Sequence, residues 1–343
     1  MSLRTIAERA GVSPSTVSLA LRGSQKIPEA TRQRVARIAA EIGYRPNAKV
    51  TELMSHVRLS RTGEITGSLG LISFYGEARP WESAPALRQV YESMTVHAEE
   101  YGYRLEPMWL RAPDLTIRRV CGILDARGIE GLICLGSPDQ QEIFPPELDH
   151  YAVVAQGPSV ASSLHRVMTH AAGDMRRALD SVFALGYRNP GLAIGPEENV
   201  PNRDAYIGAY LGWCHKKWGR PSPAPVLSPG RAGTTDAAGW IAKHGVDSVI
   251  AVHDTAGVVE FGLELQRRGV RWPVDVGIAA IAPILEGTGF SGLQENHRLI
   301  GHWTIEMLVE RIHRHELGLP AVPRLQLVES QWLKGGSLRL SLG

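Results

Sequence analysis

The chain of 343 residues has little cysteine, and its three cysteines form no C-x-x-C pair. Cys121, Cys134 and Cys214 lie too far apart in the sequence for a zinc-ligand pattern or a disulfide framework, so we expect small buried thiols and no metal site. No apolar run approaches the roughly 18 residues that a membrane span requires. The first residues also lack the basic and then apolar order of a signal peptide. These absences predict a cytoplasmic protein without a membrane partner.

Catalytic signatures are also missing. The first predicted strand is not followed by G-x-G-x-x-G, and the chain has no phosphate loop, no G-x-S-x-G and no H-E-x-x-H. We therefore predict no catalytic residue and no cofactor. Two alternatives stay open but disfavoured: a dinucleotide-independent α/β enzyme, and a solute-binding protein with a fused basic head. The enzyme leaves the basic head unexplained, and the solute-binding protein requires export.

Positive charge is concentrated at the N-terminus. Residues 1–61 hold eleven Lys and Arg against four Glu, whereas the whole chain has a net charge of only +2. The rest of the chain is therefore mildly acidic. A basic head on an acidic body indicates a nucleic-acid partner for the head alone.

The head has the pattern of three short helices. Ser2 is a candidate cap for the first, which Gly11 ends. Pro14 at the first helical position predicts a second helix over residues 14–21, and a third follows from Pro28. The connection between the first two is so short that the pattern predicts a helix-turn-helix, whose second helix enters the major groove of DNA. A helical bundle without a DNA role is the alternative.

The residues of this head resemble a known family signature. Residues 5–18 read TIAERAGVSPSTVS, and residues 44–47 read YRPN. This long ungapped run resembles the headpiece of the LacI/GalR family of bacterial transcription regulators. The resemblance implies a sequence-specific regulator, expected to be a repressor, that binds double-stranded operator DNA and whose operator affinity is controlled by a small-molecule effector.

The resemblance also implies which residues contact DNA. Pro14, Ser15 and Leu19 match base-reading positions, and Thr16 and Ser18 match phosphate-contacting ones, for which short hydroxyls are suited. Many members have Arg where this chain has Leu19, and leucine touches a thymine methyl but cannot bind guanine bidentately. The full predicted set is Thr5, Pro14, Ser15, Thr16, Ser18, Leu19, Lys26, Thr31, Asn47 and Leu53.

A hinge is expected after the head. Asn47 is a candidate cap for a short helix over residues 48–57. Leu53 matches the family's leucine that wedges into a minor-groove base step and bends the duplex, although it is also compatible with an ordinary linker leucine. We therefore predict a helix-turn-helix domain at 1–47 and a hinge helix and linker at 48–66.

Beyond the hinge, short apolar runs alternate with amphipathic stretches. Strands are expected at 69–74, 104–110, 131–135, 151–155, 191–194, 248–252 and 277–281. Helices are expected at 84–101, 117–127, 171–185, 204–218 and 256–268. This alternation predicts parallel sheets covered by helices, with ligands binding where strand ends converge.

The body resembles the periplasmic-binding-protein-like core of the same family. The fold class is therefore α/β: an all-helical head followed by two doubly wound parallel-sheet lobes. The effector-binding and dimerisation core is predicted at 67–343, with lobe 1 at about 67–160 and 290–322 and lobe 2 at about 161–289 and 323–343. A homodimer is expected, with its interface on 84–101 and 302–312.

The resemblance implies an effector, most simply a sugar or sugar derivative, between the lobes. The expected contacts, each with a structural alternative such as helix capping, a surface ion pair or lid packing, are Tyr75, Trp81, His170, Arg203, His253 and Asp254. Residues 280–283, AIAP, depart from the acidic motif common in relatives. The hexose and purine effectors of those relatives are therefore poor templates for this site. Gln294, Glu295 and Asn296 are candidate polar groups nearby.

Overall fold

The head is a compact set of three helices in the computed structural model, which describes residues 3–21, 27–42, 65, 67–136, 142–196, 202–219, 224–228 and 236–339. The helices are α1 (Leu3–Ala10), α2 (Pro14–Leu21) and α3 (Glu29–Glu41). One residue from each, Ile6, Val17 and Val35, is fully buried in their shared core. Each helix is too short to be stable alone, so this shared core holds the head together.

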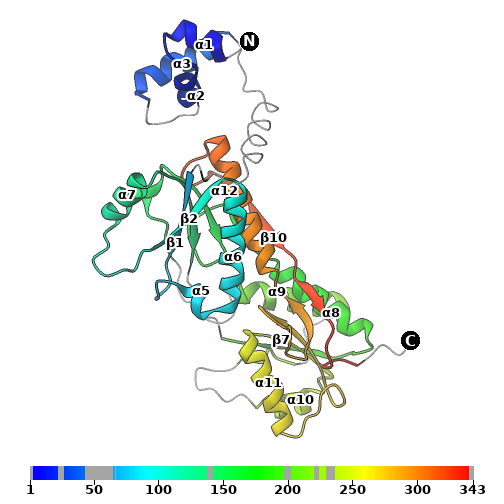
Figure 1. Cartoon of the computed structure of the whole chain (residues 1–343). Helices are drawn as coiled ribbons and strands as arrows, with labels where there is room; N and C mark the ends of the chain where they lie inside the picture. The colour runs from blue at the N-terminus through cyan, green and yellow to red at the C-terminus, as the bar shows by residue number, and fades with distance from the viewer. Residues whose placement is uncertain are drawn as a thin grey trace.

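A tight turn joins α1 to α2 (Figure 1). Gly11 has φ +63°, a left-handed conformation that glycine adopts without a Cβ penalty. The Ser13 Oγ then accepts a hydrogen bond from Thr16 N at 3.1 Å, which caps α2. The predicted helix-turn-helix geometry is confirmed.

Two sheets form the body, and the first has six parallel strands in the order β10-β5-β4-β3-β1-β2. Its strands are β1 (Gly67–Ser73), β2 (Tyr103–Trp109), β3 (Ile129–Leu135), β4 (Ala152–Gln156), β5 (Arg166–Thr169) and β10 (Leu325–Val328). Leu71 packs on one face of this sheet and Ile72 on the other, because successive side chains of a strand alternate.

Helices cover both faces of sheet 1, as a buried parallel sheet requires. Figure 1 shows α6 in cyan beside α12 in orange, and the two pack against each other on one face. On the other face lies α7. The helices of this lobe are α5 (Pro80–Ser83), α6 (Pro85–Glu100), α7 (Ile117–Ala126), the short 3-10 helix η1 (Pro146–Leu148) and α12 (His297–Arg314).

The second sheet has five strands in the order β11-β9-β8-β7-β6, of which only β11 runs antiparallel. Its strands are β6 (Pro190–Ile194), β7 (Ser248–Val252), β8 (Gly277–Ala282), β9 (Ser291–Gln294) and β11 (Gln331–Leu333). On its two faces pack α8 (Ala171–Ala184) with α9 (Arg203–Trp218), and α10 (Ala237–His244) with α11 (Thr255–Arg267). The predicted doubly wound fold class is confirmed.

The chain passes between the sheets at three segments. These lie between β5 and α8 at 169–171, between β9 and α12 at 294–297, and between β10 and β11 at 328–331. The predicted lobe boundaries after 160, 289 and 322 all fall earlier, so they assign β5, β9 and β10 to the wrong lobe. An apolar run shows that a segment is a buried strand, but it does not show which sheet the strand joins.

None of the three cysteines forms a disulfide. Cys134 and Cys214 are buried, and Cys121 is half-buried. Burial raises the pKa of the Cys134 thiol to about 12, so this thiol is unreactive. Within the described ranges, no helix is long and apolar enough to cross a membrane.

Candidate functional site

The second helix of the head has one buried side. Val17 and Ala20 are buried against α1 and α3. Helical periodicity therefore places positions 15 and 19, two of the predicted base-reading positions, on the side of α2 opposite Val17. The predicted Pro14, Thr16 and Ser18 also lie on α2.

Three predicted hydroxyl residues of the head are described in full. Thr5, Thr16 and Thr31 are each partly exposed. Thr16 Oγ1 lies 2.8 Å from Ser13 Oγ, at the start of α2. Lys26, Asn47 and Leu53, predicted to contact DNA after the recognition helix and in the hinge, lie outside the described residues.

A cavity of about 180 Å³ lies between the two sheets of the body. Its walls include Gln156 and Thr169 at the carboxyl ends of β4 and β5, and Val252 and Ala282 at the ends of β7 and β8. Because parallel strands end at the same edge of a sheet, both sheets point their carboxyl ends at this space. The volume is below the roughly 300–1,000 Å³ of drug-sized ligand sites, so the cavity suits a small ligand.

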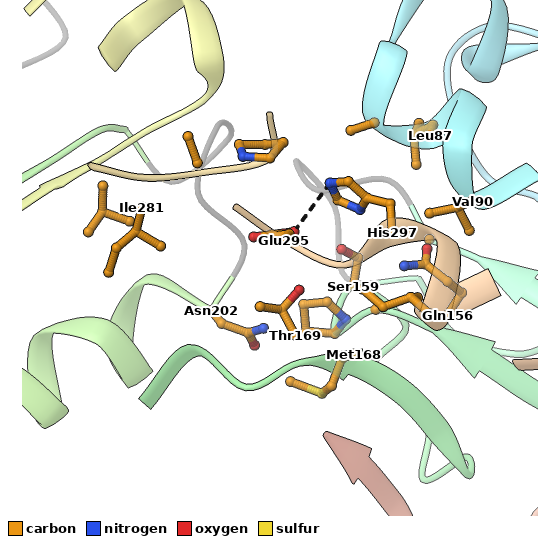
Figure 2. A pocket seen from close by; sticks show the side chains of 18 of the residues that line it. Leu87, Val90, Gln156, Ser159, Met168, Thr169, Asn202, Ile281, Glu295 and His297 are labelled. Atoms are coloured by element: carbon orange, nitrogen blue, oxygen red, sulfur yellow. Dashed lines mark ion pairs between the residues drawn. The ribbon is translucent and has the colours of Figure 1, made fainter. Parts of the chain in front are cut away.

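Polar and apolar side chains line different parts of the cavity (Figure 2). Leu87 and Val90 of α6 form one apolar side, and Ile281 and Pro283 at the end of β8 form another. The polar side chains of the lining are Tyr75, Gln156, Ser159, Thr169, Asn202, Tyr206, His253, Glu295 and His297. The apolar end of β8 is where the sequence departs from the acidic motif of relatives, so this wall offers no carboxylate.

Two of the six predicted effector contacts line the cavity. Tyr75 follows β1, and its carbonyl oxygen accepts a hydrogen bond of 2.8 Å from Trp109 Nε1, which holds the backbone at the rim. His253 follows β7, with its ring packed so closely on two glycines that a Cβ at Gly257 would lie 1.9 Å from its Nδ1. The resemblance indicated both residues as candidate contacts, and each follows a predicted strand.

Asp254 caps α11. Its Oδ1 accepts hydrogen bonds from Gly257 N at 2.6 Å and lies 2.9 Å from His253 Nδ1. Asp254 is not among the residues that line the cavity. Its carboxylate thereby orients the His253 ring, which does reach the cavity.

Trp81 and Arg203 also make contacts outside the cavity lining. Trp81 is 6% exposed and stacks on Tyr91 with ring centroids 4.3 Å apart. Arg203 donates from Nε to the Gly195 carbonyl at 3.2 Å and from Nη2 to Ser228 Oγ at 2.6 Å.

His170 lies on the first crossing segment, directly after the cavity residue Thr169. Its backbone N donates to the Val328 carbonyl at 2.8 Å, and its ring packs against Gly173. This contact joins the first crossing segment to the third.

Glu295 and His297 are polar groups of the cavity that lie on the second crossing segment. The sequence indicated Glu295 only as one of three candidates and gave no indication of His297. Gln294 and Asn296 hold the backbone instead, since Gln294 Oε1 accepts from Leu285 N and Asn296 donates to the Glu329 carbonyl. A prediction of β9 would have identified both cavity residues, because they follow directly after that strand.

A buried carboxyl group joins helix α8 to the third crossing segment. Asp174 of α8 is fully buried, accepts hydrogen bonds from Ser330 N at 3.3 Å and from Ser330 Oγ, and lies 3.6 Å from Arg177 Nη1. Burial raises its pKa to about 6 against the opposing effect of the Ser330 hydrogen bonds, and the Glu295 charge raises it further.

The same negative field acts on Tyr206. Burial raises the pKa of its phenol well above the usual value, and the charges of Glu295 and Asp174 add to that shift. Tyr206 lines the cavity, so the two carboxyl groups influence a lining side chain.

The chain is similar to known regulators along its length. The family described as "Bacterial regulatory proteins, lacI family" matches residues 2–47. The HTH-type transcriptional regulator PtxS of Pseudomonas plecoglossicida is 25% identical over 325 residues, which cover 92% of this chain and 91% of the relative. The HTH-type transcriptional repressor CytR of Escherichia coli K12 is 24% identical over 206 residues, which cover 57% of this chain and 54% of the relative.

Solved structures share the fold. The transcriptional regulator CelR in complex with cellobiose has a TM-score of 0.57 and 20% identity, covering 98% of this chain and 99% of the other. A lac repressor dimer bound to operator and the anti-inducer ONPF has a TM-score of 0.58 and 15% identity, covering 98% of each chain. At these identities the likeness concerns the fold.

Proposed function

We propose that this chain, a DNA-binding transcriptional regulator of the LacI family, binds operator DNA as a homodimer and is controlled by a small molecule in the cavity between its two lobes. The match of residues 2–47 to the lacI family of bacterial regulatory proteins supports DNA binding by the head. We infer a repressor whose effector is a sugar or sugar derivative. The related PtxS and CytR are a transcriptional regulator and a repressor, and the CelR structure holds cellobiose.

One observation carries the proposal. The cavity contacts two of the three segments that join the lobes. It contacts the first at Thr169 and the second at Glu295 and His297. A ligand there contacts the part of the chain that must change when one lobe turns against the other. The ligand can therefore bind two arrangements of the lobes with different affinities. This difference in affinity is the condition for control of DNA binding.

The head is expected to read DNA through α2. Half-site spacing in the operator should match the separation of two heads, and a two-fold protein should select a pseudo-palindromic sequence. The predicted contacts Ser15 and Leu19 lie at positions opposite the buried Val17, and the hydroxyl of Thr16 is expected to bind phosphate.

Selection of bound sequences from a random double-stranded DNA pool tests this part of the proposal. The full chain should enrich a pseudo-palindrome, and Leu19→Ala should relax the preference at one position in each half-site. Thr16→Ala should weaken binding to all sequences alike, because it removes a phosphate contact. Enrichment of no sequence, or of a single half-site without symmetry, would contradict the proposed homodimeric operator binding.

A further inference from the structure

The polar lining of the cavity contains no permanent cation. Its titratable side chains are Tyr75, Tyr206, His253, Glu295 and His297, and no lysine or arginine lines it within the described part of the chain. Sites for carboxylates and phosphates normally supply a guanidinium or ammonium group, because these bind the charge and its oxygens together. Such a group is missing from this lining.

Nearby guanidinium groups are already engaged. Arg203, the arginine most expected at the cavity from the sequence, donates to Gly195 and Ser228. Arg177 donates to the Ser330 carbonyl at 2.7 Å and lies within ion-pair distance of Asp174 and Glu329. The sequence segments next to the lining residues Gly136 and Asn202, residues 137–141 and 197–201, contain acidic residues and no lysine or arginine.

Glu295 and His297 form the most specific polar feature of the lining. Figure 2 shows the two side chains turned toward each other, and His297 Nε2 lies 3.6 Å from Glu295 Oε2. His297 is 7% exposed, and its Nε2 has no hydrogen-bond partner among the described residues. A buried polar atom without a partner is costly, so this nitrogen is expected to be satisfied by a bound group.

A hydroxyl group fits between these two side chains, because it can pair with a ring nitrogen and also donate to a carboxylate. A carboxylate or phosphate fits poorly, since it only accepts hydrogen bonds when ionised and would face Glu295 as a like charge. The charges of Glu295 and Asp174 also add to the raised pKa of the Tyr206 phenol, which lines the same cavity.

We propose that Glu295 and His297 make this cavity selective for an uncharged polyhydroxyl ligand of monosaccharide size and exclude the corresponding sugar acids and sugar phosphates. This rests on the proposed function, in which the cavity binds the effector. The selectivity comes from an unpaired imidazole nitrogen and a carboxylate that accept and orient neighbouring hydroxyls, together with a lining free of lysine and arginine in the described chain.

Matched ligand series test the proposal on the full chain. D-glucose, D-galactose, D-xylose and D-ribose would each be compared with the aldonate and the terminal phosphate of the same sugar, by thermal unfolding and then by titration calorimetry. At least one neutral sugar should bind, and its acid and phosphate should bind at least about tenfold more weakly. An acid or phosphate that binds as tightly as its parent sugar would overturn the inference and leave the proposed function standing.

Variants link the selectivity to the named residues. Glu295→Gln keeps the shape and removes the charge, so the preference for a sugar over its aldonate should fall by about tenfold. Glu286→Gln removes an equal charge from the exposed connection before β9 and should leave the preference unchanged. His297→Asn, which keeps a polar group, should weaken binding of the neutral sugar without reversing the preference for the sugar over its aldonate.

Two further results would overturn the inference. An unchanged preference in Glu295→Gln would show that another group sets the charge selectivity. Binding of no member of any series, with sequence-specific DNA binding retained, would contradict both this inference and the effector part of the proposed function.

Discussion

Asp174 is a carboxyl group with no exposed surface at the point where the chain crosses between the two sheets. Its folded-state pKa of about 6 is higher than the ordinary value of 3.8. Between these two values the folded state binds more protons than the unfolded state. The free energy of unfolding therefore declines as pH rises from about 4 to about 6, and the contribution of the neutral acid is lost above that window.

Asp174→Asn is expected to remove this decline. The amide keeps an acceptor for Ser330 and carries no charge, so the variant should be more stable than the parent at pH 7, by up to about 3 kcal/mol for a shift of about two pH units. Urea unfolding between pH 4.5 and 7.5 measures the effect. The exposed Asp204→Asn serves as the control and should keep the slope of the parent. Parallel pH profiles for Asp174→Asn and the parent would contradict this account.

The ring of His253 occupies space that only glycine leaves free. A Cβ at Gly257 would lie 1.9 Å from His253 Nδ1, so Gly257→Ala should destabilise the protein by about 1–3 kcal/mol through overpacking. Most of that loss should return when His253→Ala is added, because the clash partner is then gone. Gly208→Ala on α9, where an added Cβ meets nothing within 4 Å, is the matched control and should be neutral or stabilising. Equal stability of the two glycine variants in urea would contradict the close packing of the His253 ring on Gly257.

Single residues also show why the site could be predicted only in part. Tyr75 and His253, which the resemblance indicated and which follow predicted strands, both line the cavity. Asp254 also follows a strand but accepts the Gly257 amide instead, and sequence alone does not decide between capping and ligand contact. His297 gave no signal, because its role depends on the adjoining strand β9 and on its burial in the folded chain.

At the scale of elements, the central strands and their helices were predictable. The strand expected at 248–252 is β7, and the helix expected at 171–185 is α8 to within one residue. A strand covered on both faces is a continuous apolar run, and an amphipathic helix repeats its apolar residues with the helical period. Both signals are local, so a single sequence contains them.

The four strands that the sequence missed are short, and two of them, β10 and β11, lie at sheet edges. β10 and β11 have four and three residues, and Leu325 of β10 is 57% exposed. β5 and β9 have four residues each. Such strands are held by pairing with residues far away in the sequence, so local composition does not reveal them. These are the strands that flank the crossing segments, which explains why the lobe boundaries were misplaced.

Helix α2 depends on its cap. Ser13→Ala removes the acceptor for Thr16 N and should cost about 1 kcal/mol. For an eight-residue helix in a small core, this loss should lower the hydrogen-exchange protection of the α2 amides by about fivefold. Ser13→Asn retains a capping side chain and should keep most of the protection. Equal protection in Ser13→Ala and the parent would mean that tertiary packing alone holds α2.

At the scale of the whole molecule, the protein is two α/β lobes joined by three crossing segments, with a small helical head at its N-terminus. The first segment is linked to the third by His170 with Val328, and the second to the third by Asn296 with Glu329, while Asp174 of α8 binds Ser330 of the third. The cavity contacts the first two segments. Occupation of the cavity is therefore expected to favour one lobe arrangement and, in the proposed homodimer, one arrangement of the two heads.

Reciprocal coupling between ligand and DNA tests this central claim most directly. The affinity of the full chain for its selected duplex would be measured with and without the neutral sugar that stabilises it, and the affinity for the sugar with and without the duplex. The account predicts that each ligand changes the affinity of the other by the same factor, in the range of about 5–150-fold, and that Glu295→Gln reduces this factor. Equal DNA affinity with the cavity empty and saturated would contradict it.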